Sequence, residues 1–333
     1  MNRKLLFGIM AVLVLAVIGG SFLLMQGTKQ KVYRVGVLSG LEFFADTTDG
    51  FKAGMAELGY EEGSNIVYDV ERSNIDMAKY GSILRKFVAD KVDLIFVFPT
   101  EAAMMAKAAT KETNIPVVFT NAFIEDTGLV NSVREPGGNI TGVRWAGPDL
   151  ALQRYEIMRE LVPQAKRMWI PYQKDYPIVR SQLKALRQTF AADGLTMIEL
   201  PSNNVSELNA QLRERAGSFD NVTDVILMIV EPLAVTPGCF EVMAKFAAEN
   251  KIPVGGAFMS IGGYESLFGL TPQSVPQGKQ AAFLADKILR GASAGAIPVV
   301  SAESYFQINY KAAKKLGLNV SEGLLGKAKE IIR

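Results

Sequence analysis

Acidic side chains recur in the short loops that follow the predicted strands of this 333-residue chain. A carboxylate in such a loop can hold an ammonium group through charge-assisted hydrogen bonds. In an open parallel sheet, ligands bind beyond the carboxyl ends of the strands, where these loops meet. The acids that could hold a ligand amine are Glu42, Glu101, Asp175 and Glu231.

Two hydroxyl residues in the same loops point to the complementary chemistry. Thr100 and Ser39 each stand just before a predicted helix. The free N–H groups at a helix N-terminus favour an anion, so either loop could hold a ligand carboxylate. Two alternatives stay open: Thr100 is an ordinary cap of its own helix, and Glu101 only complements the helix dipole.

Aromatic residues complete the candidate site. Such a lining, with isolated polar groups, suits a small organic ligand that has an apolar body and a charged head. Trp145 is the foremost aromatic candidate because it stands at the predicted crossover between two halves of the chain, although each aromatic could instead pack in the core or hinge. The predicted ligand-binding residues are Ser39, Glu42, Phe43, Pro99, Thr100, Glu101, Asn121, Trp145, Tyr172, Asp175, Tyr176, Glu231 and Phe258.

Composition excludes many kinds of enzyme. The chain has no histidine and a single cysteine, Cys239, so His-based catalysis, Ser-His triads, intramolecular disulfides and His or Cys-cluster metal sites are excluded. It also lacks the glycine-rich phosphate loop, the dinucleotide fingerprint and the G-x-S-x-G elbow. We therefore expect no catalysis and no cofactor or metal. An enzyme based on paired carboxylates is the alternative that stays open.

Charge and the N-terminus indicate where the protein works. With 36 basic and 34 acidic residues, the chain has no basic field for nucleic acid. A basic head at residues 1–4 precedes an uncharged run at residues 5–25, about the length that spans a bilayer. We expect residues 1–30 to be a signal anchor, or else a cleaved signal peptide, and the remainder to be extracytoplasmic.

Short apolar runs alternate with amphipathic stretches from residue 31 onward, which predicts an α/β fold with parallel sheets covered by helices. The alternation pauses at a turn cluster, 135–139, and restarts near 148. The short final section, with a helix expected at 322–332, must complete one or both halves. We expect lobe 1 to comprise 31–145 plus about 268–300, and lobe 2 to comprise 146–267 plus about 301–333.

Several ordered segments resemble a known family, the ABC-transporter substrate-binding proteins related to tryptophan- and tyrosine-binding importer components. The resemblance extends over about 300 residues. Its matching segments are residues 50–65, 89–95, 115–120, 136–143, 249–254 and 312–318.

The resemblance implies a periplasmic-binding-protein fold of the first type, which grips an amino-acid-like ligand, aromatic amino acids included, between its lobes and delivers it to an ABC permease and its ATPase. By position, the loops at Ser39, Thr100, Asn121, Tyr172 and Glu231 correspond to those that line the family's cleft. The chain departs from many relatives in lacking a lipobox cysteine near the apolar run. A membrane-anchored sensory module that signals through a partner is the alternative function.

Overall fold

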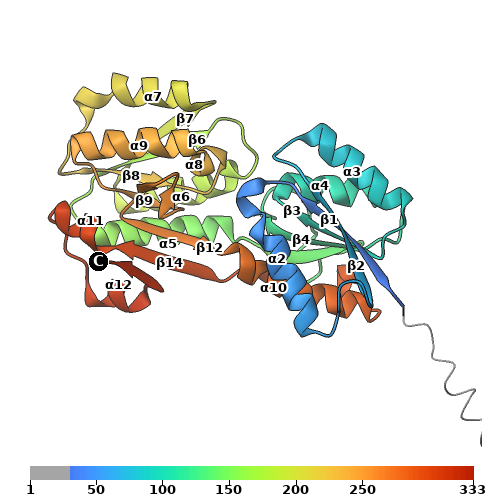
Figure 1. The fold of residues 1–333 in the computed structure, drawn as a ribbon. Helices are drawn as coiled ribbons and strands as arrows, with labels where there is room; N and C mark the ends of the chain where they lie inside the picture. Colours follow the sequence, from blue (N-terminus) through green and yellow to red (C-terminus); the bar gives the residue numbers. More distant parts are fainter. Residues whose placement is uncertain (1–30) are drawn as a thin grey trace, which may run out of the picture.

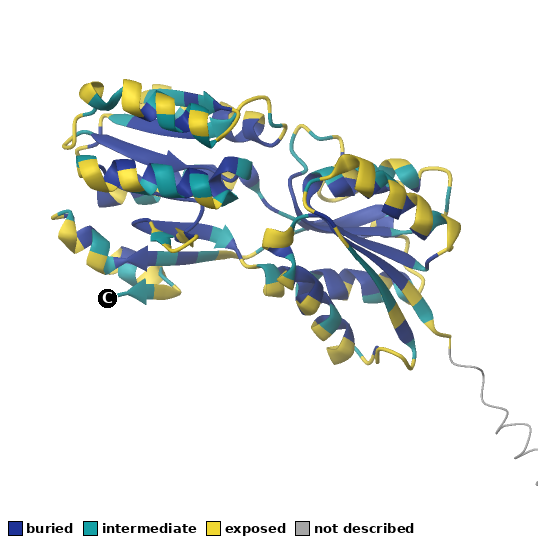
Figure 2. Cartoon of the chain, turned by 45° about the horizontal axis from the view of Figure 1, so that its top comes forward, coloured by how far each residue is buried: buried dark blue, intermediate teal, exposed yellow. Residues whose placement is uncertain are grey.

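The computed structural model describes residues 31–333, which form two α/β lobes joined side by side (Figure 1). Each lobe has one central sheet with helices on both faces, as the alternation in the sequence predicts. Buried residues concentrate in the strands and on the inward helix faces, whereas exposed residues lie on the outer helix faces (Figure 2).

The first sheet has the strand order β13-β5-β4-β3-β1-β2, and all of its neighbouring strands are parallel. Its central strand β3 is buried along its whole length, and its residues alternate between the core clusters on the two faces, as the period of two for a strand requires. The strands are β1 (Tyr33–Ser39), β2 (Ile66–Arg72), β3 (Leu94–Phe98), β4 (Val117–Ala122), β5 (Ile140–Arg144) and β13 (Val300–Ser301).

Helices α2 (Asp46–Glu57) and α10 (Ser274–Leu289) pack together on one face of this sheet, and α3 (Met77–Ala89) and α4 (Thr100–Ala109) cover the other. The contact between α2 and α10 depends on glycine. A Cβ atom at Gly278 would lie 2.2 Å from the carbonyl oxygen of Thr47. The two backbones therefore approach too closely for any side chain at this position.

The second sheet has the order β15-β14-β12-β9-β8-β6-β7. Its strands pair in parallel except for β12 and β14, which are antiparallel, so this sheet is mixed rather than wholly parallel. The strands are β6 (Arg167–Gln173), β7 (Thr196–Ser202), β8 (Asp224–Met228), β9 (Val254–Gly256), β12 (Phe268–Pro272), β14 (Ser304–Asn309) and β15 (Glu330–Ile332), with a small hairpin of β10 (Ser260–Ile261) and β11 (Tyr264–Glu265) beside them.

Helices α5 and α6 pack together on the second lobe, and α7 packs with α9. The short helices α11 and α12 belong to the last part of the chain. The helices are α5 (Gly147–Leu161), α6 (Val179–Asp193), α7 (Val205–Glu214), α8 (Pro232–Val235), α9 (Pro237–Asn250), α11 (Tyr310–Lys315) and α12 (Glu322–Lys327), and the 3-10 turns of the chain are η1 (Glu42–Phe44), η2 (Ala216–Ser218) and η3 (Ala294–Ala296).

Two expectations for the last section are corrected by strand pairing. The helix expected over 322–332 ends at Lys327, because β-branched Ile331 and Ile332 extend along β14 and complete its edge. Residues 268–272, expected in lobe 1, form β12 and pair with β9 and β14 of the second sheet. The chain therefore enters α10 only after Pro272.

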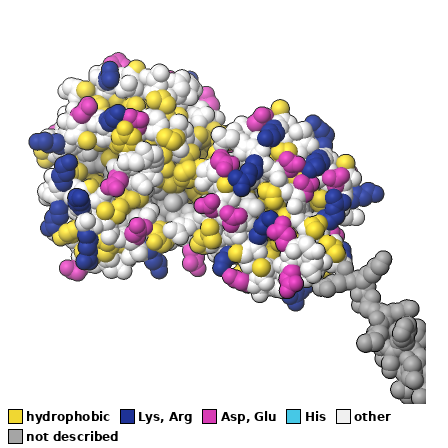
Figure 3. All heavy atoms as spheres, in the orientation of Figure 1, with side chains coloured by type: hydrophobic (Ala, Val, Ile, Leu, Met, Phe, Trp, Pro, Cys, Tyr) yellow, Lys and Arg dark blue, Asp and Glu magenta, His cyan; other side chains and the backbone are white. Residues whose placement is uncertain are grey.

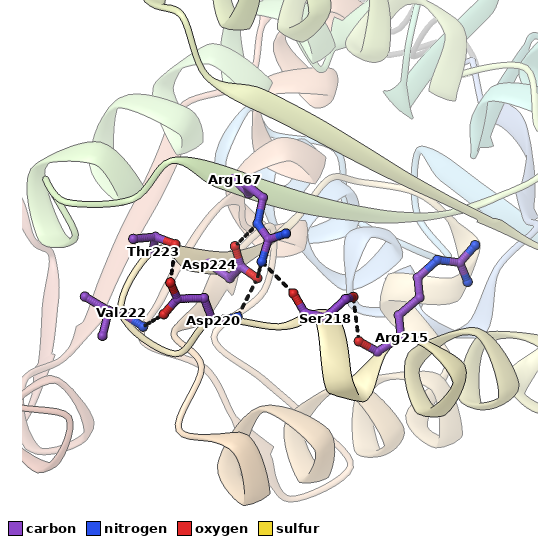
Figure 4. A network of polar contacts seen from close by, with 7 residues as sticks. All are labelled: Arg167, Arg215, Ser218, Asp220, Val222, Thr223 and Asp224. Carbon is purple, nitrogen blue, oxygen red and sulfur yellow. Dashed lines mark hydrogen bonds and ion pairs between the residues drawn. The ribbon is translucent and has the colours of Figure 1, made fainter.

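An ion pair at the amino-terminal edge of the second sheet joins β6 to β8 (Figure 4). Both oxygens of the fully buried Asp224 carboxylate accept hydrogen bonds from the Arg167 guanidinium, at 2.6 Å each. Arg167 also donates to the carbonyl oxygen of Ser218, and Asp224 accepts from the backbone N–H of Asp220. The pair raises the pKa of Arg167, chiefly through the hydrogen bond to Asp224, and ties the turn before β8 to the sheet.

The chain passes between the two sheets three times: from β5 to α5, from β12 to α10 and from β13 to β14. No helix within residues 31–333 is both long and apolar enough to cross a bilayer. The apolar run expected to be an anchor, residues 5–25, lies outside the described residues.

Candidate functional site

A cavity with about 420 Å³ of empty space lies between the two lobes. The first lobe contributes residues from the loops after β1, β2, β3, β4 and β5, and the second contributes residues from the loops after β6 and β8. Its lining residues are Leu41, Phe44, Ile75, Pro99, Thr100, Glu101, Asn121, Phe123, Trp145, Tyr176, Ile178, Val230, Glu231, Pro232 and Val235.

The structure brings seven of the thirteen predicted site residues into this lining. They come from both lobes. These residues are Pro99, Thr100, Glu101, Asn121, Trp145, Tyr176 and Glu231.

The other six predicted residues do not line the cavity. Ser39 is buried at the end of β1, and Asp175 lies in the turn after β6 with a φ of 58°. The exposed Glu42 pairs with Arg72 at 3.2 Å. Tyr172 donates to Glu199 on the neighbouring strand β7, at 2.8 Å, and burial with this bond raises its pKa to about 12.

Phe43 and Phe258, the last two of these six, contact each other across the lobes. Their rings meet edge to face with centroids 5.3 Å apart. Phe258 is buried, whereas Phe43 is 43% exposed. This aromatic pair joins the two lobes beside the cavity without entering it.

The N-terminus of α4 opens onto the cavity. Pro99 is the N-cap and offers no capping side chain. Since the first intrahelical bond runs from the N–H of Ala103 to the carbonyl of Pro99, three N–H groups of the first turn precede it. The Thr100 hydroxyl accepts a bond from the N–H of Phe123, at 3.1 Å, so Thr100 is not an ordinary cap of its own helix.

Glu101 links the two lobes and keeps one oxygen available. Its Oε1 accepts a hydrogen bond from the Tyr176 hydroxyl at 2.5 Å. Its Oε2 is buried and accepts no hydrogen bond from any residue in 31–333. Burial, followed by the nearby Glu101 charge, raises the pKa of Tyr176, so this phenol stays a donor. A buried carboxylate oxygen without a donor favours a ligand that supplies one.

Asn121 stands at a bulge in β4, where the pairing with β5 shifts between Phe119 and Ala122. Its φ of 47° is left-handed, a region that asparagine tolerates better than most residues. Its side-chain amide donates to the Thr47 hydroxyl at 2.7 Å. With the amide in this orientation, Oδ1 is buried and has no donor among the residues that the structure describes.

Glu231 is the N-cap of the short helix α8. Its carboxylate accepts from the N–H groups of Leu233, Ala234 and Gln173, at 2.9, 2.6 and 2.8 Å. Burial raises its pKa to about 7, although the three backbone bonds oppose this shift. Glu231 therefore uses its oxygens to hold the loops of its own lobe together, which differs from Glu101.

The apolar part of the cavity wall includes residues that the sequence did not single out. Phe44, 7% exposed, packs edge to face on Trp145 at 5.4 Å, and Phe123 lies 6.2 Å from the same ring. In the sequence, their position in the predicted loops is the feature that could have marked them as lining residues. The other missed lining residues are Leu41, Ile75, Ile178, Val230, Pro232 and Val235.

Taken as chemistry, the cavity offers anion-binding N–H groups at α4, two buried acceptor oxygens on Glu101 and Asn121, and apolar walls. This combination matches a zwitterion with an apolar side chain. Across the part of the chain that the structure describes, no group of three or more Cys, Asp or Glu side chains could hold a metal ion.

Comparison with known proteins identifies sequence relatives. The model of a family described as ABC transporter substrate-binding protein matches residues 37–332. A tyrosine-binding protein of Clostridioides difficile (strain R20291) is 30% identical over 282 residues, covering 81% of this chain and 76% of the relative.

Solved structures share the fold over almost the whole chain. A conserved domain protein from Vibrio cholerae has a TM-score of 0.78 at 27% identity and covers 90% of this chain and 100% of its own. The ligand-free, open structure of a substrate-binding protein with adhesive properties from Clostridium difficile has a TM-score of 0.71 at 25% identity, covering 91% and 99%. An ABC domain from Streptococcus pneumonia in complex with L-Trp, 23% identical with a TM-score of 0.77 and coverage of 91% and 100%, shows likeness of fold.

Proposed function

The chain belongs to the ABC transporter substrate-binding protein family, and we propose that it captures an amino acid with an aromatic side chain between its two lobes. The relative named a tyrosine-binding protein supports this class of ligand. The observation that carries the proposal is the composition of the interlobe cavity.

Each part of an aromatic amino acid has a matching group there. The α-carboxylate would lie at the N-terminus of α4, where no side chain within residues 31–333 caps the first turn. The α-ammonium would donate to Oε2 of Glu101 and Oδ1 of Asn121, which are buried acceptors without donors from the described residues. The aromatic body would contact Phe44, Phe123 and Trp145.

Capture would proceed by closure of one lobe on the other. Tyr176 on the second lobe already reaches Glu101 on the first, and Phe43 contacts Phe258 beside the cavity. A ligand that contacts both lobes stabilises the closed state by its differential affinity. The proposed lobes follow the strand pairing: 31–145 plus 273–301, and 146–272 plus 302–333.

We further propose that the protein works outside the cytoplasm, held at the membrane by its N-terminal apolar segment, and passes its ligand to an ABC permease driven by an ATPase. It would perform no reaction on the ligand.

Positive and negative side chains are interspersed over the face in Figure 3, with hydrophobic side chains beside the junction of the lobes.

The test is direct identification of the ligand. Residues 30–333 would be purified from the native host, and small molecules released by denaturation would be identified by mass spectrometry. Calorimetric titration with L-tyrosine, L-tryptophan and L-phenylalanine would follow, with L-leucine and myo-inositol as controls. We expect saturable binding of at least one aromatic amino acid. Tight binding of the sugar alcohol, with none of the aromatic amino acids bound, would refute the proposal.

A further inference from the structure

Trp145 is fixed by a residue that does not itself line the cavity. Its indole N–H donates to the side-chain oxygen of Gln277, and both residues are 1% exposed. We propose that Gln277 is a positioning residue, which holds the Trp145 ring as an apolar wall and so gives the site its preference for an aromatic ligand. This inference rests on the proposed function.

The backbone of Trp145 is already held on both sides. Its N–H donates to the carbonyl of Ala122 on β4, at 2.8 Å, and its own carbonyl accepts from Gly147, at 2.9 Å. These bonds place the Cα atom but leave the ring to be oriented by its neighbours. Phe44 and Phe123 contact the ring through apolar edges, which do not select one orientation of the indole N–H. The hydrogen bond to Gln277 does select it.

Gln277 is itself a rigid acceptor. It lies in the first turn of α10, and its amide nitrogen donates to the carbonyl of Gln273 at 3.2 Å, which leaves its oxygen for the indole. Next to it, Gly278 brings α10 into backbone contact with Thr47 and Phe51 of α2. Because α10 cannot shift along α2 without a clash, the oxygen of Gln277 has a fixed position in the first lobe.

The consequence for the ligand concerns polarity. With its N–H bonded to Gln277, Trp145 offers a ligand only its carbon surface, so a hydroxyl or amide group in contact with it gains no partner. Without Gln277, the indole N–H becomes a buried donor in search of an acceptor. The ring would then turn, the wall would lose its shape for an aromatic body, and polar ligands would be rejected less strongly.

The proposed experiment uses three variants of residues 30–333. Gln277→Met matches the size of the side chain but removes the amide acceptor, Gln277→Glu keeps an acceptor oxygen, and Gln211→Leu removes a half-buried glutamine that donates to Pro201 and Ser202 in the second lobe. Each substitution is combined with Trp169→Phe in the same protein, which leaves Trp145 as the single tryptophan of residues 31–333. Calorimetry gives the affinities for L-tyrosine and L-glutamine, and acrylamide quenching reports the exposure of Trp145.

We expect Gln277→Met to weaken L-tyrosine binding about tenfold, because binding must then restore a ring orientation that the hydrogen bond had fixed, at a cost similar to one hydrogen bond. The variant should also bind L-tyrosine with a smaller preference over L-glutamine, and acrylamide should quench Trp145 more strongly. Gln277→Glu should restore both readouts, and Gln211→Leu should change neither. If quenching and affinity are unchanged in Gln277→Met, the inference is overturned. It is also overturned if Gln277→Glu shows the same affinity and the same quenching as Gln277→Met. If the parent protein binds none of L-tyrosine, L-tryptophan and L-phenylalanine, the proposed function fails, and quenching alone decides whether Gln277 orients the ring. If Gln277→Met does not fold, Gln277→Leu provides the same comparison, because it also lacks the amide acceptor.

Discussion

Replacing Glu101 by glutamine should remove the partner of the ligand amine while keeping an acceptor for Tyr176. The free oxygen of Glu101 is buried, so water screens its charge weakly. A hydrogen bond to a charged group contributes about 2 kcal/mol, which corresponds to roughly thirty-fold in affinity. We therefore expect Glu101→Gln to weaken binding of an aromatic amino acid by about that factor.

The assay compares two ligands by calorimetry, L-tyrosine and its deaminated analogue. Wild-type protein should bind L-tyrosine more tightly than the analogue, because only L-tyrosine has an ammonium group for Glu101 to hold. Glu101→Gln should therefore bind L-tyrosine more weakly and the analogue almost as before, so most of the preference is lost. Glu42→Gln is the matched control, since Glu42 lies in a neighbouring loop but is exposed and paired with Arg72. Equal weakening of both ligands, or none, would refute the assignment of Glu101 to the amine.

Three further predictions concern stability. Arg167→Met should lower the free energy of unfolding by about 3–5 kcal/mol in denaturant titration, because it leaves the buried carboxylate of Asp224 unpaired. The double variant Arg167→Met/Asp224→Leu should recover part of this loss. If Arg167→Met is as stable as the wild type, the prediction is contradicted. Burial raises the pKa of Glu231 from 4.5 to about 7. The free energy of unfolding of the wild type relative to Glu231→Gln should therefore be greatest below pH 4.5 and fall by about 3 kcal/mol as the pH rises through 7. A difference in unfolding free energy that does not change with pH would count against this prediction. Gly278→Ala should destabilise the protein by about 1–3 kcal/mol in calorimetric unfolding, since its Cβ would overlap α2, whereas Gly217→Ala, with no atom near its Cβ, should be close to neutral.

The sequence predicted the alternation of strands and helices because the strands are continuous apolar runs, of which Leu94–Phe98 is the clearest. It failed at the carboxyl-terminal end. The run Glu330–Ile332 is too short for its own pattern to distinguish strand from helix, and β14 decides the outcome by pairing with it. Local pattern thus predicted the long elements, and tertiary pairing determined the short ones.

For the site, the sequence indicated the right loops but not always the right side chains within them. Phe43 and Phe44 are adjacent, yet a 3-10 turn with three residues per turn separates their directions by about 120°. Phe44 lines the cavity, whereas Phe43 is 43% exposed and contacts Phe258 instead. Gln277 carried no signal at all, since its partner Trp145 lies 132 positions away in the chain. Such pairs depend on how the lobes are assembled.

The three passages of the chain between the lobes also determine the order in which the protein can be completed. During synthesis from the N-terminus, the first sheet has no β13, and α2 has no α10 to cover it, until residues 274–301 emerge. Neither lobe is a continuous segment, so neither can finish folding on the ribosome before most of the other has been made. The face of α2 that α10 covers therefore stays exposed in the nascent chain until its synthesis is almost complete.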